Sequence, residues 1–131
     1  LDPERARQEV IAIHEAFARK RRLLIDGLRG AGLVVEHEPD GGFYVWANVA
    51  SLPAPLNDGD AFFEAALAEH VITVPGMFFD INPGKRRADH TSRFRQYLRF
   101  SFGPDEASVA LAVQRLQAMV ARVALKDGAR R

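Results

Sequence analysis

Hydrophobic residues recur along this chain with two different periods. A period close to 3.6 residues predicts helices over residues 4–28, 60–69 and 105–123. Asp2 can cap the first helix and Pro3 suits its first position, so its start is well marked. The apolar stripe of this helix is expected to comprise Val10, Ile13, Phe17, Leu24 and Leu28.

Alternation of apolar and polar residues predicts strands. Residues 42–49 and 97–101 alternate strictly, and residues 71–74 form a short apolar run that ends at Pro75. Residues 33–37 predict a fourth strand, which we expect to pair with residues 42–49 as an antiparallel hairpin across a glycine-rich turn.

The order of these elements is helix, two strands, helix, two strands, helix. Three amphipathic helices of this kind bury their apolar stripes most simply against a sheet. We therefore expect an α/β (α+β) fold, with a small, mostly antiparallel sheet of three to four strands and three helices packed on it. The 131 residues are enough for one domain, and residues 126–131 are expected to form a polar tail.

Composition excludes several classes of function. Eighteen Lys and Arg residues against 17 Asp and Glu give a formal charge of +1, which argues against a dedicated nucleic-acid binder. The chain has no cysteine, and no apolar run approaches the length of a membrane span. Its four histidines show no metal-ligand spacing, so we expect no metal. From the balanced charge, the lack of a long apolar run and the absence of cysteine, we expect no nucleic-acid partner, no membrane partner and a cytoplasmic location.

Arg99 is the candidate with the clearest chemistry. In the strand predicted at residues 97–101, Leu98 and Phe100 point to one face, whereas Tyr97, Arg99 and Ser101 point to the other. An arginine held by a stiff strand presents a planar fork of donors that fits a carboxylate or a phosphate. Taken alone, the segment favours the simpler interpretation, an arginine on the solvated face of a sheet.

Three segments in order resemble one enzyme family. These are residues 41–46 (GGFYVW), 74–79 (VPGMFF) and 97–102 (YLRFSF). Together they resemble the C-terminal small domain of fold-type I, pyridoxal-phosphate-dependent aminotransferases of classes I and II. The resemblance implies amino-group transfer between an amino acid and a 2-oxo acid. It also implies that Arg99 binds the substrate's α-carboxylate, and that Met77 and Phe78 lie beside the substrate cleft.

The resemblance further implies that the cofactor site lies elsewhere. In this family a lysine of the large domain binds pyridoxal 5'-phosphate covalently, and that domain precedes the segment seen here. Residues 1–125 would be the small domain, with residues 1–30 as the end of an interdomain helix. Because the chain begins with Leu1, we expect a domain excised from a larger, homodimeric enzyme. Lys85 lies in a basic loop and is not expected to bind the cofactor, so the chain alone should be inactive.

Two alternatives remain open from the residues themselves. One is a non-catalytic α/β binding module similar to RNA-recognition domains, in which strand aromatics stack on bases. Against it stand the balanced charge and the segment around Arg99, whose aromatic residues fall mostly on the opposite face. The other is a structural or dimerising domain. The amino donor, the 2-oxo acid and the pathway are not encoded in these residues.

Overall fold

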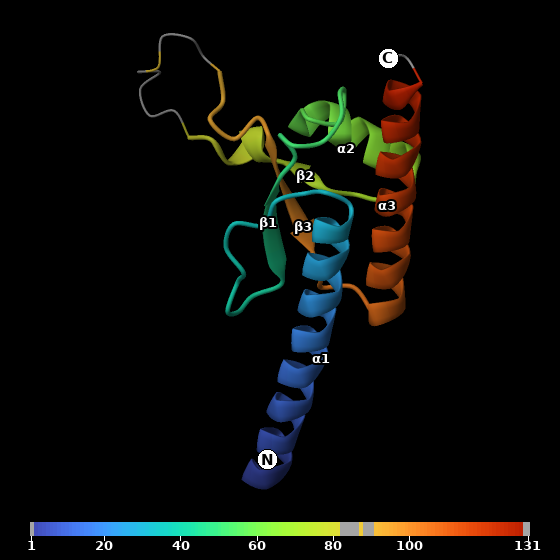
Figure 1. The fold of residues 1–131 in the computed structure, drawn as a ribbon. Helices are drawn as coiled ribbons and strands as arrows, with labels where there is room; N and C mark the ends of the chain where they lie inside the picture. The colour runs from blue at the N-terminus through green and yellow to red at the C-terminus, as the bar shows by residue number, and fades with distance from the viewer. Residues whose placement is uncertain (1, 82–86, 88–90, 130–131) are drawn as a thin grey trace.

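The computed structural model describes residues 2–81, 87 and 91–129. In this part of the chain, three α-helices, one 3-10 helix and one three-stranded sheet form (Figure 1). In chain order the elements are α1 (Pro3–Gly30), β1 (Tyr44–Asn48), α2 (Gly59–Ala68), β2 (Val74–Pro75), η1 (Gly76–Phe79), β3 (Tyr97–Ser101) and α3 (Glu106–Gly128).

The sheet has the order β1-β3-β2, and β3 is antiparallel to both of its neighbours. Its register places Arg99, at the centre of β3, opposite Trp46 of β1 and Val74 of β2. The residue predicted to carry the chemistry is therefore held by two flanking strands. This small antiparallel sheet with three helices confirms the predicted fold class.

The helices lie on one side of the sheet, and the core is between them and it (Figure 1). The inward residues Val45, Ala47, Leu98 and Phe100 are at most 3% exposed. On β3, the inward Phe100 packs edge-to-face against Phe62 of α2. The alternation in residues 97–101 thus separates a buried face from the opposite face, which bears Arg99.

Two predicted strands differ from the structure. Residues 33–37 form only an isolated bridge between Val34 and Asn48. The following Glu38 accepts hydrogen bonds from Arg22 and Arg29, which holds this part of the chain against α1 and not along β1. Of the strand predicted at residues 71–74, only Val74 lies in β2, because the Val71 N–H donates to the Ala66 carbonyl and so completes the end of α2. The strand β2 extends instead to Pro75, which an edge strand tolerates.

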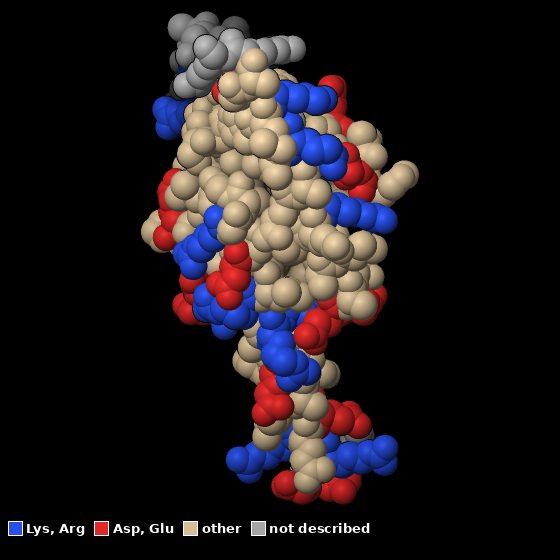
Figure 2. Space-filling model, turned by 45° about the vertical axis from the view of Figure 1, so that its right-hand side comes forward, with Lys and Arg blue, Asp and Glu red and all other residues tan. Residues whose placement is uncertain are grey.

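The first half of α1 projects from the body of the domain (Figure 1). Val10 and Ile13 were expected in its buried stripe, but they are 59% and 57% exposed. No described element packs against these first turns, whereas Leu24 and Leu28 lie in the core. Figure 2 shows acidic and basic side chains interspersed around this projecting end, so the view contains no face of a single sign there.

Lys20 is the exception in the basic cluster of α1. Four consecutive basic residues in a helix, here residues 19–22, are typical of a solvated surface, but Lys20 is only 8% exposed. Its Nζ donates to the carbonyl oxygens of Gly103 and Pro104, at 3.1 and 2.9 Å, and lies over the Phe17 ring. Lys20 therefore fastens α1 to the connection between β3 and α3.

Helix α3 is longer and more apolar than the sequence pattern suggested. It continues to Gly128, so the predicted polar tail from residue 126 begins as helix, with Lys126 suitably placed in the last turn. By length and composition alone α3 could cross a membrane, contrary to the expectation that no run approached that length. The core helix of a globular domain passes the same test, and α3 buries Val109, Val113 and Leu116 in the core.

Candidate functional site

Arg99 lies on the sheet face that the helices leave uncovered. It is half-buried at the middle of the central strand, with β1 on one side and β2 on the other. Strict alternation in β3 fixes this orientation, since a slip of one residue would turn Arg99 into the core. The backbone therefore holds the base of this long side chain firmly.

Aromatic rings flank the guanidinium. Its Cζ lies 4.1 Å from the ring centroid of Tyr44 in β1 and 4.8 Å from that of Phe79 in η1. The rings continue across the same face: Trp46 stacks on Tyr97 at 5.4 Å, and it meets Phe79 edge-to-face at 5.7 Å. The sequence argument that aromatic residues fall mostly opposite Arg99 holds for residues 97–102, where Phe100 and Phe102 are buried, but it is wrong for the sheet face as a whole.

The Val-Pro-Gly turn explains why Phe79 reaches Arg99. A Cβ on Gly76 would lie 2.4 Å from the Phe94 carbonyl oxygen and 2.8 Å from that of Tyr97, so only glycine permits this approach of backbones. The turn thereby brings η1 against the start of β3. Met77 and Phe78, the residues expected to line the cleft, lie in this turn and are 43% and 73% exposed. The ring that contacts Arg99 is that of their neighbour Phe79.

The donors of the Arg99 guanidinium are not engaged within the described part of the chain. There, no carboxylate lies within ion-pair distance of Arg99, and no acceptor takes a hydrogen bond from it. The nearby Tyr97 hydroxyl donates instead to Glu36, at 3.0 Å. A half-buried cation with free in-plane donors can take an anionic group of a ligand.

Asp80, which directly follows η1, binds three residues further along the chain. This carboxylate accepts hydrogen bonds from the Arg87 guanidinium, from the Ser92 hydroxyl at 2.8 Å and from the Arg93 N–H at 2.9 Å. The hydrogen bond from Arg87, followed by those from Ser92 and Arg93, lowers the pKa of Asp80 well below its usual range. Lys85, in the same segment, lies outside the described residues.

The described residues do not fit a site for covalently bound pyridoxal phosphate. Such a site needs a lysine whose amine faces a ligand in a packed environment. Lys20 is packed, but its amine is held by two backbone carbonyls, and Lys126 is exposed on α3. What these residues do fit is the recognition of a carboxylate by Arg99.

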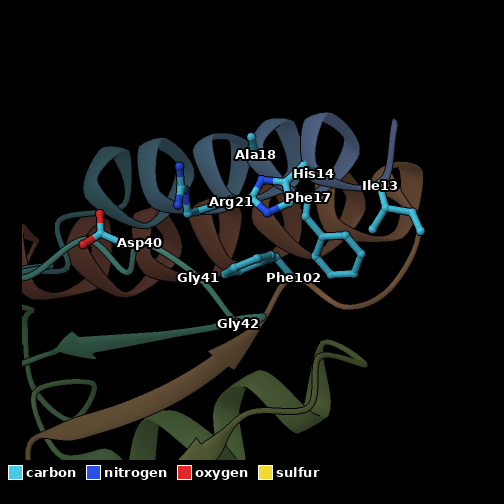
Figure 3. Close-up of a pocket in the computed structure, with 9 residues that line it drawn as sticks. All are labelled: Ile13, His14, Phe17, Ala18, Arg21, Asp40, Gly41, Gly42 and Phe102. Carbon is cyan, nitrogen blue, oxygen red and sulfur yellow. The ribbon is translucent and has the colours of Figure 1, made fainter. Parts of the chain in front are cut away.

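A hollow of about 290 Å³ lies between α1 and the turn that precedes β1, apart from Arg99 (Figure 3). Phe17 and Phe102 form its apolar wall, and their rings meet edge-to-face at 6.2 Å. Figure 3 shows Arg21 and Asp40 at one end, where the Arg21 guanidinium donates to the Pro39 carbonyl at 2.7 Å. Because Arg21 is engaged and Asp40 is exposed, no buried polar group is aimed into this hollow.

The sequence matches the family described as aminotransferase class I and II over residues 1–116. This match covers most of the chain, and the fold and the three segments around Arg99 agree with it. The chain therefore belongs to the aminotransferase class I and II family.

Individual relatives agree with the family match. The chain is 28% identical over 117 residues to an aspartate aminotransferase of Rhizobium meliloti, covering 83% of the chain and 25% of that protein. It is 31% identical over 102 residues to a valine–pyruvate aminotransferase of Mycobacterium tuberculosis, covering 77% and 23%. Among solved structures, the aspartate aminotransferase of Thermus thermophilus with maleate superposes with a TM-score of 0.68 at 27% identity, over 88% of the chain and 26% of its own.

The chain spans about a quarter of the length of these curated relatives. Sequence reasoning found Arg99 but gave no role to Tyr44 or Phe79, although both residues are in the segments that carry the resemblance. The alternation in β1 does put Tyr44 on the outer face. Its contact with Arg99 depends on a strand register that no local pattern specifies.

Proposed function

We propose that this chain is part of a pyridoxal-phosphate-dependent aminotransferase, in which Arg99 binds the α-carboxylate of the substrate. The proposal covers transfer of an amino group between an amino acid and a 2-oxo acid by a homodimeric, cytoplasmic enzyme. The observation that supports it most is the guanidinium of Arg99, which is half-buried and without a carboxylate partner among the described residues. It occurs in a chain that belongs to the aminotransferase class I and II family.

One arginine can serve both directions of this reaction. An amino acid and a 2-oxo acid each carry a carboxylate next to the carbon at which the amino group is exchanged. Two parallel hydrogen bonds from a guanidinium fix both the position and the plane of that carboxylate. Arg99 would thus orient the reacting carbon, which raises the rate by holding the substrate in a productive geometry.

The rings around Arg99 strengthen this interaction. Tyr44 and Phe79 exclude water from part of the guanidinium surface, and an ion pair is stronger where the effective dielectric constant is lower. Bound pyridoxal phosphate supplies the electron sink of the reaction. Its lysine and phosphate contacts would come from the part of the family fold that this chain does not span, and the projecting half of α1 would pack there.

Substitution of Arg99 in the enzyme that contains this chain tests the proposal. Arg99→Lys keeps the charge but loses the paired donors, so kcat/KM should fall. Arg99→Ala should lower kcat/KM further, by roughly 10- to 100-fold, for the amino donor and the 2-oxo acceptor alike. Cofactor absorbance should stay at the wild-type level. Values within about threefold of wild type for every substrate would show that Arg99 does not bind the carboxylate.

A further inference from the structure

We propose that Tyr44 and Phe79 are positioning residues, whose rings hold the Arg99 guanidinium ready to receive a carboxylate. The inference rests on the proposed function of Arg99 and adds how that side chain is held. Neither ring is expected to contact the reacting atoms. Their effect on the substrate would pass entirely through Arg99.

The two rings reach Arg99 from elements on either side of β3. Tyr44 lies on β1 and Phe79 follows β2, whereas Arg99 is on β3 between these strands. The two ring centroids lie 4.1 and 4.8 Å from Cζ, within the range of cation–π attraction. A long side chain between two rings loses much of its rotational freedom before any ligand arrives, which lowers the entropic cost of binding.

Rings hold an arginine differently from carboxylates. A carboxylate would occupy the guanidinium donors and neutralise the charge that a substrate must meet. A ring attracts the same cation without supplying a negative charge, so the net charge of the site is kept. This distinction matters here, because no described carboxylate pairs with Arg99.

Both rings are themselves supported. The Tyr44 ring packs on that of Phe43 at 4.4 Å, and Phe79 meets Trp46, which in turn stacks on Tyr97. The Tyr44 hydroxyl has no hydrogen-bond partner among the described residues. The ring of Tyr44 and not its hydroxyl is therefore expected to matter, and this makes Tyr44→Phe a matched control.

The test compares Tyr44→Leu with Tyr44→Phe in the enzyme that contains this chain. The probe is 3-phenylpropanoate, a simple carboxylate that cannot react, measured as a competitive inhibitor. Tyr44→Leu should raise its inhibition constant roughly tenfold, and Tyr44→Phe should stay within about twofold of wild type. The kcat/KM for an amino acid should fall in parallel. Turnover of the matching amine without a carboxylate should not change. Phe79→Leu gives a second test should Tyr44→Leu fail to fold.

A double-mutant cycle shows whether the rings act through Arg99. In an Arg99→Ala background, Tyr44→Leu should leave the inhibition constant unchanged. An equal loss with and without Arg99 would mean that Tyr44 contacts the ligand itself, and the inference would be wrong. If Arg99→Ala weakens the inhibitor but Tyr44→Leu and Phe79→Leu do not, the inference fails and the proposed function stands. If Arg99→Ala has no effect, the proposed function fails.

Discussion

Of the two glycines in α1, Gly27 is expected to tolerate an added side chain less well than Gly30. A Cβ added at Gly27 would lie 2.3 and 2.7 Å from the two Cγ atoms of Val113 in α3. Carbon atoms in contact prefer separations of about 3.5–4.0 Å, so α1 and α3 would have to move apart by about 1 Å. Gln117 also donates a hydrogen bond to the Gly27 carbonyl at 3.1 Å, and this bond would be stretched.

The magnitude for Gly27→Ala follows from two opposing effects. Overpacking a core contact typically costs about 1–3 kcal/mol, whereas alanine in place of glycine favours a helix by about 1 kcal/mol. The net loss should be up to about 2 kcal/mol, or up to roughly 8 °C in the midpoint of thermal unfolding. Gly128→Ala is the matched control, because a Cβ there meets nothing within 4 Å. It should be neutral or slightly stabilising.

Thermal unfolding followed by circular dichroism checks this prediction. In the double variant with Val113→Ala, the obstructing methyl groups are removed, so the combined loss should be smaller than the sum of the two single losses by about 1 kcal/mol or more. The reasoning about helix packing would be refuted if Gly27→Ala matched Gly128→Ala, or if the losses from Gly27→Ala and Val113→Ala simply added.

Three further predictions concern the buried Lys20, the paired Glu38 and the cofactor. Lys20→Met should destabilise the chain by about 1–3 kcal/mol in thermal unfolding, because two carbonyls lose their donor. Lys126→Met is the control and should have little effect. Equal unfolding midpoints for the two variants would count against the role given to Lys20. Hydrogen bonds from Arg22 and then Arg29 lower the pKa of Glu38 to about 2. A carboxyl with a lowered folded-state pKa stabilises above its unfolded value near 4.5 and loses this effect as the pH falls towards 2. The midpoint difference between wild type and Glu38→Gln should therefore shrink across that window, and a constant difference would contradict the ion pairs. Finally, the chain alone should form no stoichiometric adduct with pyridoxal phosphate, and an absorbance band that survives dialysis would overturn this.

Local sequence patterns predicted best the elements whose conformation depends least on residues distant in the sequence. Residues 97–101 match β3 because strict alternation between a buried and an open face leaves one register. The strand predicted at 33–37 formed only the Val34–Asn48 bridge, because Glu38 is held against α1 by Arg22 and Arg29, and these contacts are not visible in the local pattern. Lys20 looked solvated because nothing in its own helix signals that two carbonyls from the β3–α3 connection will surround it.

The candidate site was predictable in its central residue but not in its surroundings. Arg99 could be found from the alternation of β3 and from the family resemblance. Its contacts with Tyr44 and Phe79 arise from strand pairing and from a turn that only Gly76 permits, and these join segments far apart in the sequence. Side chains that meet through the register of a sheet are not specified by the period of any one strand.

The most direct measurement of the role of Arg99 is substrate discrimination in the enzyme that contains this chain. The kcat/KM for an amino acid is compared with that for the same compound without its carboxylate, in wild type and in Arg99→Ala. If Arg99 binds the carboxylate, the preference of the wild type for the amino acid should fall by roughly 10- to 100-fold in the variant, with the amine itself unaffected. An unchanged preference, or an equal loss for both compounds, would contradict the assignment of Arg99 as the carboxylate-binding residue.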